Sequence, residues 1–121
     1  MANEITRADS LSATKGGATI SSGTLSKQVD MTGVDMGTNS QNIGITNEVL
    51  NIPTDIAQPI HLVIKNLDGA NFVEIFRESL NAQLISKLNP GESCSLCRLN
   101  VIPFGRADTA AVQIQWWACE V

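Results

Sequence analysis

Hydrophobic and polar residues alternate in short runs along the chain, and turn-forming residues separate these runs. The alternation is plainest in residues 112–119, where Val112, Ile114, Trp116 and Ala118 share one parity. Successive side chains of a strand point to opposite faces, so this run predicts a strand with one buried face. No segment keeps the apolar period of a long amphipathic helix.

Further strands are predicted wherever β-branched and apolar residues gather between turn residues. Their ranges are 24–31, 42–47, 49–52, 60–66, 72–77, 83–88 and 93–101. Strand 60–66 is expected to be buried on both faces, because apolar residues fill most of it. Leucines recur every four positions at Leu80, Leu84 and Leu88, so a short helix is the alternative for this segment.

Two turns fix the spacing of these strands. Asp68-Gly69 predicts a tight hairpin turn, because glycine accepts the positive φ that such turns require. Asn89-Pro90-Gly91-Glu92 predicts a type II turn, with proline and glycine at its two central positions. Roughly six to eight short strands joined by frequent turns predict an all-β fold, either an antiparallel sandwich or a jelly-roll-like barrel.

The first third of the chain has a different composition. Ser, Thr, Gly and Asn occupy 21 of the 38 positions from residue 10 to residue 47. Such a stretch buries little apolar surface per residue. We therefore predict that residues 1–20 form an extended N-terminal arm, flexible or ordered by a partner, and that residues 21–121 form a single β domain.

Composition and charge narrow the partners that we expect. The chain has 121 residues, which suits one domain, and 8 basic against 12 acidic residues. No basic block is present, so we expect no nucleic-acid partner. No run approaches the roughly 20 apolar residues of a membrane-spanning helix, so we expect no membrane partner. The N-terminus does not resemble a secretory signal, and the three cysteines suggest free thiols in a reducing cytosol.

Candidate chemistry is sparse. Cys94 and Cys97 have C-x-x-C spacing, and with Cys119 and His61 they could in principle hold zinc. Residues three apart on an extended strand point to opposite faces, so we interpret the cysteines as small apolar fillers. His61 has no evident nucleophile or orienting carboxylate near it in the sequence. We expect no catalytic residue, no cofactor and no metal, and we do not expect an enzyme.

The best candidate for an interface is the pair Trp116-Trp117. Adjacent strand residues face opposite ways, so one tryptophan can enter the core while the other emerges, although a neighbouring loop could also cover both. An exposed tryptophan often anchors an interface, and we predict this role for Trp117. In the arm, we predict Ile5, Leu11 and Ile20 as apolar interface residues.

Three short segments in the second half resemble those of a known group of proteins. Asn66-Leu67-Asp68-Gly69-Ala70-Asn71-Phe72-Val73 resembles the N-L-D-x-x-N-F/Y-V run of small virion proteins of tailed bacteriophages. As in those proteins, a K-L-x-P-G-E turn follows at residues 87–92, and an Ala-Asp-Thr-Ala-Ala-Val segment follows at residues 107–112. The resemblance covers residues 60–121 and does not extend to the N-terminal half.

The resemblance implies a structural role in a virion assembled in the host cytoplasm. The leading expectation is a capsid decoration (cement) protein that binds the outer head surface between capsomers and stabilises it. Its partners would be the major capsid protein and further copies of itself, as a homotrimer. One alternative is a small tail or neck accessory protein, such as a fibre-attachment or receptor-proximal domain. Another is a carbohydrate-binding β-sandwich, for which Trp117 and Glu120 are the only candidate contacts.

Overall fold

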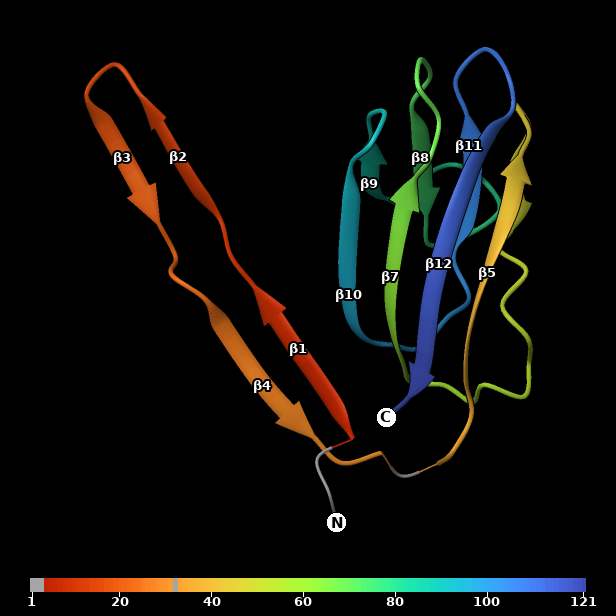
Figure 1. Ribbon diagram of the computed structural model, residues 1–121. Coiled ribbons are helices and arrows are strands. Elements are labelled where there is room, and N and C mark those ends of the chain that lie inside the picture. The colour runs from red at the N-terminus through yellow and green to blue at the C-terminus, as the bar shows by residue number, and fades with distance from the viewer. Residues whose placement is uncertain (1–3, 32) are drawn as a thin grey trace. The chain divides into compact units, whose positions relative to one another are not determined.

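The chain divides into two compact units. The computed structural model describes residues 4–31 and 33–121, and the units are Met1–Thr32 and Gly33–Val121. All the regular structure in the described residues is β-strand, as predicted (Figure 1). The predicted boundary lay between residues 20 and 21. The structure places it later, because residues 18–29 form the second limb of a hairpin that begins in the predicted arm.

The first unit is one long β-hairpin. Its strands are β1 (Ile5–Asp9), β2 (Ser12–Lys15), β3 (Ala18–Ser21) and β4 (Leu25–Val29). β1 pairs antiparallel with β4, and β2 pairs antiparallel with β3. Gly16 and Gly17 make the turn with φ values of +58° and +84°. Two-residue hairpin turns of this kind need positive φ at both central residues, which explains the glycine pair.

A bulge interrupts the second limb of the hairpin. Residues 22–24 of this limb lie between the two paired regions, opposite only residues 10 and 11 of the first limb. Gly23 takes a φ of +63°, which supplies the left-handed conformation at the extra residue. Ser22 N–H donates a hydrogen bond to the Leu11 carbonyl at 2.9 Å and keeps the two limbs joined.

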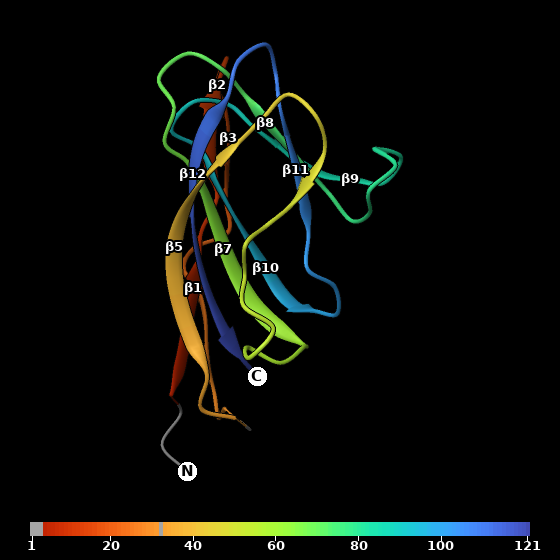
Figure 2. The same cartoon turned by 90° about the vertical axis from the view of Figure 1, so that its right-hand side faces the viewer.

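The second unit is a sandwich of eight strands in two sheets. They are β5 (Met36–Ile43), β6 (Glu48–Val49), β7 (Ile60–Asn66), β8 (Val73–Phe76), β9 (Leu84–Leu88), β10 (Ser93–Leu99), β11 (Phe104–Ala107) and β12 (Val112–Glu120). One sheet has the order β10-β7-β12-β5 and the other β6-β11-β8-β9. The two layers are visible in Figure 1 and, turned, in Figure 2.

The strand pairing is nested from the outside inwards. Within this unit the first strand pairs with the last (β5 with β12), and the second with the seventh (β6 with β11). The third then pairs with the sixth (β7 with β10), and the fourth with the fifth (β8 with β9). This order defines a jelly roll, and its two sheets remain separate instead of closing into a barrel.

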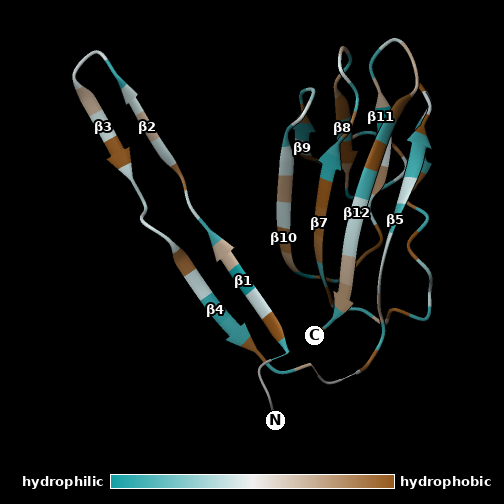
Figure 3. Ribbon diagram, in the orientation of Figure 1, coloured by the Kyte–Doolittle hydropathy of each residue, from teal (hydrophilic) through white to brown (hydrophobic). Residues whose placement is uncertain are grey.

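The hydrophobic core lies between these two sheets. Its buried residues are Ile43, Leu50, Ile52, Ile56, Ile60, Leu62, Ile64, Val73, Ile75, Leu88, Ala107, Val112, Ile114, Trp116 and Ala118. Figure 3 shows hydrophobic colour concentrated in strands such as β7 and β8. Every member belongs to the second unit, so the sandwich has a core of its own.

Most of the predicted strands in the second half are confirmed. The range of β7 is the predicted one, and β8, β9, β10 and β12 each overlap a predicted strand. Residues 84–88 are a strand, so the helical alternative for the leucine repeat is wrong. The predicted turn at residues 89–92 is also present, with a φ of +81° at Gly91 and a hydrogen bond from Glu92 N–H to the Asn89 carbonyl.

Two expectations about this unit were wrong, and one strand was not predicted. Gly69 does not adopt positive φ, because residues 67–72 carry the chain from one sheet to the other and make no tight hairpin. The strand expected over 42–47 ends at Ile43, and β5 extends N-terminally from there. β11 was not predicted, because it is short and includes Gly105.

Candidate interaction surfaces

Trp116 and Trp117 point to opposite faces of β12. Trp116 is 2% exposed, and its Nε1–H donates a hydrogen bond to Asn51 Oδ1 at 2.6 Å. Trp117 is 41% exposed and lies on the outer face of the first sheet. The prediction that one tryptophan enters the core while the other emerges is confirmed. An interface role for Trp117 stays a prediction.

Trp117 lies in a partly apolar patch on this outer face. Across the strands it stands opposite Thr38 of β5 and Val63 of β7. Two residues further along β12, Cys119 stands opposite Met36, whose side chain is exposed. We call the residues Met36, Val63, Trp117 and Cys119 the Trp117 patch. Its aromatic centre and polar surroundings are typical of an interaction surface.

Glu120 does not contribute to this patch. It is three positions from Trp117, so the two side chains leave opposite sides of the strand. The Glu120 side chain is buried, and its carboxylate accepts hydrogen bonds from Ala57 N–H at 2.9 Å and Asp35 N–H at 3.4 Å. The tryptophan–carboxylate pair that a sugar site would use is therefore absent here.

The hairpin has two chemically different faces. Cross-strand partners share a face, and the register pairs Ile5 with Val29, Arg7 with Lys27 and Asp9 with Leu25. Nearer the tip, this face continues with the pairs Ala13–Ile20 and Lys15–Ala18. The other face is formed by Thr6, Ala8, Ser12, Thr14, Thr19, Ser21, Ser26 and Gln28, none of which is charged. We call these surfaces the apolar–cationic face and the Ser/Thr face.

The bulge at Gly23 keeps the apolar–cationic face continuous. Ile20 and Leu25 are five residues apart, so a regular strand would place them on opposite faces. The extra residue in the bulge reverses the alternation and brings both side chains to one face. The composition of the limb alone did not indicate this face. Gly23 could have indicated it, because a glycine inside a strand-like run is a signal for a bulge.

The predicted arm residues differ in exposure. Ile20 is 61% exposed, and Leu11 and Leu25 are similarly open. Ile5, by contrast, is 6% exposed and so is already buried within the chain. Leu11 lies between β1 and β2, four residues from Arg7 and two from Ala13, and both of these neighbours are on the apolar–cationic face. Leu11 and Ile20 are thus the predicted residues best placed for a partner.

The outer face of the second sheet carries another apolar row. Phe104 stands opposite Val49 on one side and Phe76 on the other, and Phe76 stands opposite Leu84. The ends of the row, Val49 and Leu84, are exposed. Beside it, Arg106 forms an ion pair with Glu74 at 2.8 Å. This row is not visible as a pattern in the sequence, because its members come from four short strands.

Asn66 joins the segments on which the phage resemblance depends. Its buried side chain donates hydrogen bonds from Nδ2 to the carbonyls of Asn71 and Leu88, at 3.0 and 2.9 Å. Its Oδ1 accepts a hydrogen bond from Asp68 N–H at 2.8 Å. The Asn66 N–H donates to the Glu92 carbonyl at 2.9 Å, which adds the Pro-Gly turn to the same cluster.

The third segment reaches this cluster through its own contacts. Asp108 N–H donates to the Phe72 carbonyl at 3.2 Å, and the Thr109 hydroxyl donates to Asn71 Oδ1 at the same distance. The segments at residues 66–73, 87–92 and 107–112 therefore meet at one end of the sandwich. Their residues serve turns and loop packing.

Two carboxylates accept hydrogen bonds from backbone N–H groups of their own loops. The backbone N–H groups of Asn71 and Ala70 bind the Asp68 carboxylate and hold its pKa below the ordinary value. Glu78 is similar: the N–H of Gln83 lowers its pKa most, burial opposes this, and the N–H groups of Ala82 and Leu80 add to the lowering. Both carboxylates are used structurally.

Cys94 and Cys97 lie in different surroundings on β10. Cys94 packs against the core, and burial raises the pKa of its thiol, while Cys97 is exposed. They lie on opposite sides of β10, as expected for this spacing. His61 Nδ1 accepts a hydrogen bond from Arg98 N–H at 3.3 Å. Within residues 4–31 and 33–121, no group of His, Cys, Asp and Glu is arranged to hold a metal ion.

No protein family, curated protein or solved structure matches the chain. In the described part of the chain, there is also no helix of the length and hydropathy needed to span a membrane.

Proposed function

We propose that the chain is a virion structural protein, a capsid decoration protein that binds the outer surface of a tailed-phage head between capsomers. The observation that carries this proposal is a jelly-roll sandwich joined in one chain to a hairpin with an exposed apolar–cationic face. Jelly rolls are frequent in viral capsid proteins, and uncovered apolar faces mark interaction surfaces.

The two units suit such a protein for different reasons. The sandwich has its own core and turns fastened around Asn66, so it can serve as a rigid body. The hairpin offers Leu11, Ile20 and Leu25 to a partner, and the Trp117 patch offers a second surface. Two separate contact surfaces allow one molecule to join neighbouring subunits of a shell. Many weakly bound copies then stabilise the shell together.

Cryo-EM of particles that contain the protein tests its location directly. We expect density for the sandwich at symmetry-related positions over the whole head. A few copies confined to the neck or tail would contradict the decoration role and support the tail or neck accessory alternative.

A binding assay with purified heads tests the surface that we assign. We expect Ile20→Lys to weaken binding, because it places a charge in the centre of the apolar–cationic face. Thr19→Lys is the matched control, since it adds the same charge one residue away on the Ser/Thr face. Equal binding by the two variants would show that this face is not the contact surface.

A carbohydrate-binding role is the weaker candidate. Jelly rolls also occur in lectins, so the fold alone does not decide between these functions. The separation of Trp117 from Glu120 removes the only sugar-binding pair that the sequence suggested. We expect a glycan array to give no specific signal with the full chain. A reproducible hit that Trp117→Ala abolishes would favour the lectin role.

A further inference from the structure

A shallow groove runs beside the free edge of β5. It lies between residues 35–39 on one side and a loop that includes Pro53, Asp55 and Ile56 on the other, and Trp116 contributes to its lining. β5 pairs only with β12 in the described residues, so its other edge is not covered by a strand. The nearest atoms that a Cβ at Gly37 would meet are Ile56 Cδ1 at 3.6 Å and the Trp116 ring at 4.0 Å.

The lining of this groove indicates what it would bind. An open strand edge can pair with an extended segment through main-chain hydrogen bonds. The lining includes two carboxylates, Asp35 and Asp55, and no basic side chain. It also includes the apolar residues Met36, Ile56 and Trp116. The groove therefore suits an extended strand that carries both apolar and cationic side chains.

Strand β4 of the hairpin has this chemistry. Leu25, Lys27 and Val29 share one face, so a cation lies between two apolar residues. Lys27 also stands directly opposite Arg7, and like charges in this position repel each other. A carboxylate from a partner would relieve that repulsion. β4 pairs only with β1 in the described residues, so its outer edge can accept another strand.

The charges of the hairpin and of the sandwich are complementary. Residues 4–31 hold three acidic and three basic residues, and the apolar–cationic face carries all three basic side chains (Arg7, Lys15 and Lys27) but only one acidic side chain, Asp9. Residues 33–121 hold nine acidic and five basic residues, a formal charge of −4. The hairpin of one copy thus presents cations to a net acidic sandwich of another.

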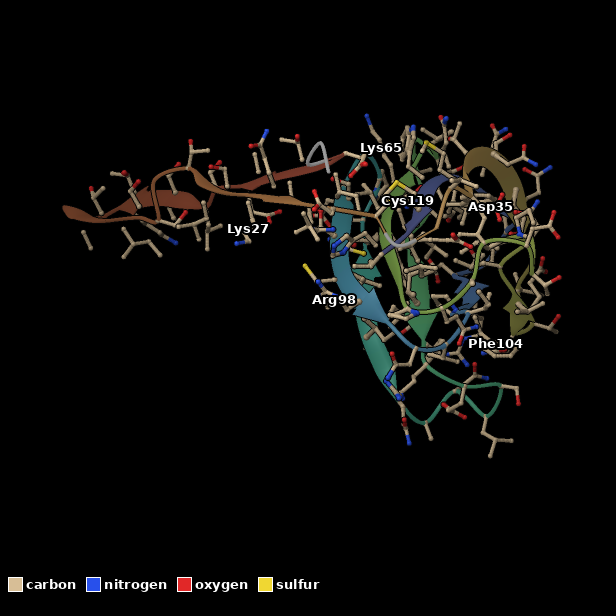
Figure 4. All side chains as sticks on the ribbon, turned by 90° about the horizontal axis from the view of Figure 1, so that it is seen from below. Lys27, Asp35, Lys65, Arg98, Phe104 and Cys119 are labelled. Carbon is tan, nitrogen blue, oxygen red and sulfur yellow. The ribbon has the colours of Figure 1, made fainter. Side chains whose placement is uncertain are left out.

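We propose that β4 of one copy pairs with the free edge of β5 in a second copy, with Lys27 beside Asp35 and Asp55. Figure 4 labels Lys27 on the hairpin and Asp35 at the sandwich. The contact joins two different surfaces, so repeating it produces a closed ring where the rotation closes and an open filament where it does not. This inference concerns self-association alone and would stand without the virion role.

Sedimentation velocity of the full chain over a range of concentrations tests the proposal. We expect concentration-dependent assembly that weakens as salt is raised, because salt screens the charge pairs. Lys27→Glu should weaken self-association about tenfold or more, because it replaces an attraction with a repulsion. The matched control is Gln28→Glu, which adds a negative charge to the Ser/Thr face of the same strand and should have little effect.

A charge exchange identifies the partner residues. Asp55→Lys alone should weaken assembly as Lys27→Glu does, and the double variant Lys27→Glu/Asp55→Lys should restore it. Circular dichroism of each variant checks that the sandwich remains folded. A protein that stays monomeric at all concentrations would overturn the proposal. Equal losses from Lys27→Glu and Gln28→Glu, or no recovery in the double variant, would also overturn it.

Discussion

The hairpin and the sandwich are both built from antiparallel strands, but only the sandwich has a hydrophobic core. Every residue of the core cluster lies between Ile43 and Ala118, whereas β2 and β3 are exposed along their whole length. A two-stranded hairpin alone is marginally stable in water, because ordering its backbone costs entropy that little burial offsets. Strand pairing thus organises both units, while a hydrophobic core stabilises only the sandwich.

This difference predicts that the two units respond differently to substitution. A change in the core should unfold the sandwich, while a change in the hairpin should affect local opening and binding without lowering the global stability. Cooperative units of one protein commonly open with different free energies in this way.

The largest effect is expected at Trp116. Trp116→Ala removes a buried ring and leaves Asn51 Oδ1 without its donor, so it should lower the free energy of unfolding by about 3–5 kcal/mol. Urea denaturation measures this change. Trp117→Ala is the matched control, and it should cost no more than about 1 kcal/mol, because Trp117 is partly exposed. Similar losses from both variants would contradict the assignment of inner and outer faces.

A smaller but clear effect is expected at Gly33, where the sandwich begins. A Cβ at this position would lie 1.4 Å from Glu120 Oε2, so the carboxylate would have to move away from the N–H groups of Ala57 and Asp35. We expect Gly33→Ala to cost about 1–3 kcal/mol in a denaturation experiment. At Gly69 a Cβ meets nothing within 4 Å, so Gly69→Ala is the control, and a comparable loss there would refute this explanation.

In the hairpin, the turn glycines should control local order. Gly17 has a φ of +84°, so Gly17→Ala should destabilise the turn by about 1–2 kcal/mol. Hydrogen exchange should become faster in residues 5–29, while the unfolding midpoint of the sandwich stays constant. Gly16→Asn should preserve the protection, because Asn-Gly suits this type of turn. A fall in the sandwich midpoint with Gly17→Ala would show that the two units unfold together.

The smallest effect is expected in the pH dependence of stability, and it should be confined to the sandwich. The pKa of Asp68 is lowered in the folded state from an ordinary 3.8, and that of Glu78 from 4.5. A lowered folded pKa stabilises the protein above the unfolded value, and this contribution is lost as the pH falls through the folded pKa. Thermal unfolding from pH 6 down to about pH 3 should show the loss. Asp68→Asn and Glu78→Gln should each flatten the curve, and an unchanged curve in the double variant would rule out this source.

Local patterns predicted the strands whose side chains alternate most clearly. β7 and β12 were found because apolar residues mark their buried faces, and Gly91 indicated its turn. In the hairpin, the predicted strand 24–31 is confirmed as β4, whereas β1, β2 and β3 were missed because small and polar residues dominate them, although Gly16-Gly17 is a recognised signal for a two-residue turn. These polar strands have no hydrophobic alternation of their own. They are strands because they pair with the opposite limb, and a local sequence pattern does not report that pairing.

The nested strand order and the groove beside β5 depend on contacts between distant parts of the chain. β5 pairs with β12, and the groove combines residues 35–39 with Ile56 and Trp116. No local run of residues reports such a combination. Trp117 could be assigned to an outer face because adjacent strand residues point to opposite faces and Trp116 is its neighbour. The groove could not be predicted in this way, because its residues come together only in the folded sandwich.

The contact between Gly33 and Glu120 has a practical consequence for protein engineering. It brings the two ends of the sandwich together, and Val121 N–H adds a hydrogen bond to the Pro59 carbonyl at 3.3 Å. A short peptide could therefore link Val121 to Gly33. New termini could then be opened elsewhere in the sandwich, which would give a circular permutant. The connection between β8 and β9, where exposed Leu80 lies, offers a site for such an opening or for displaying an inserted peptide.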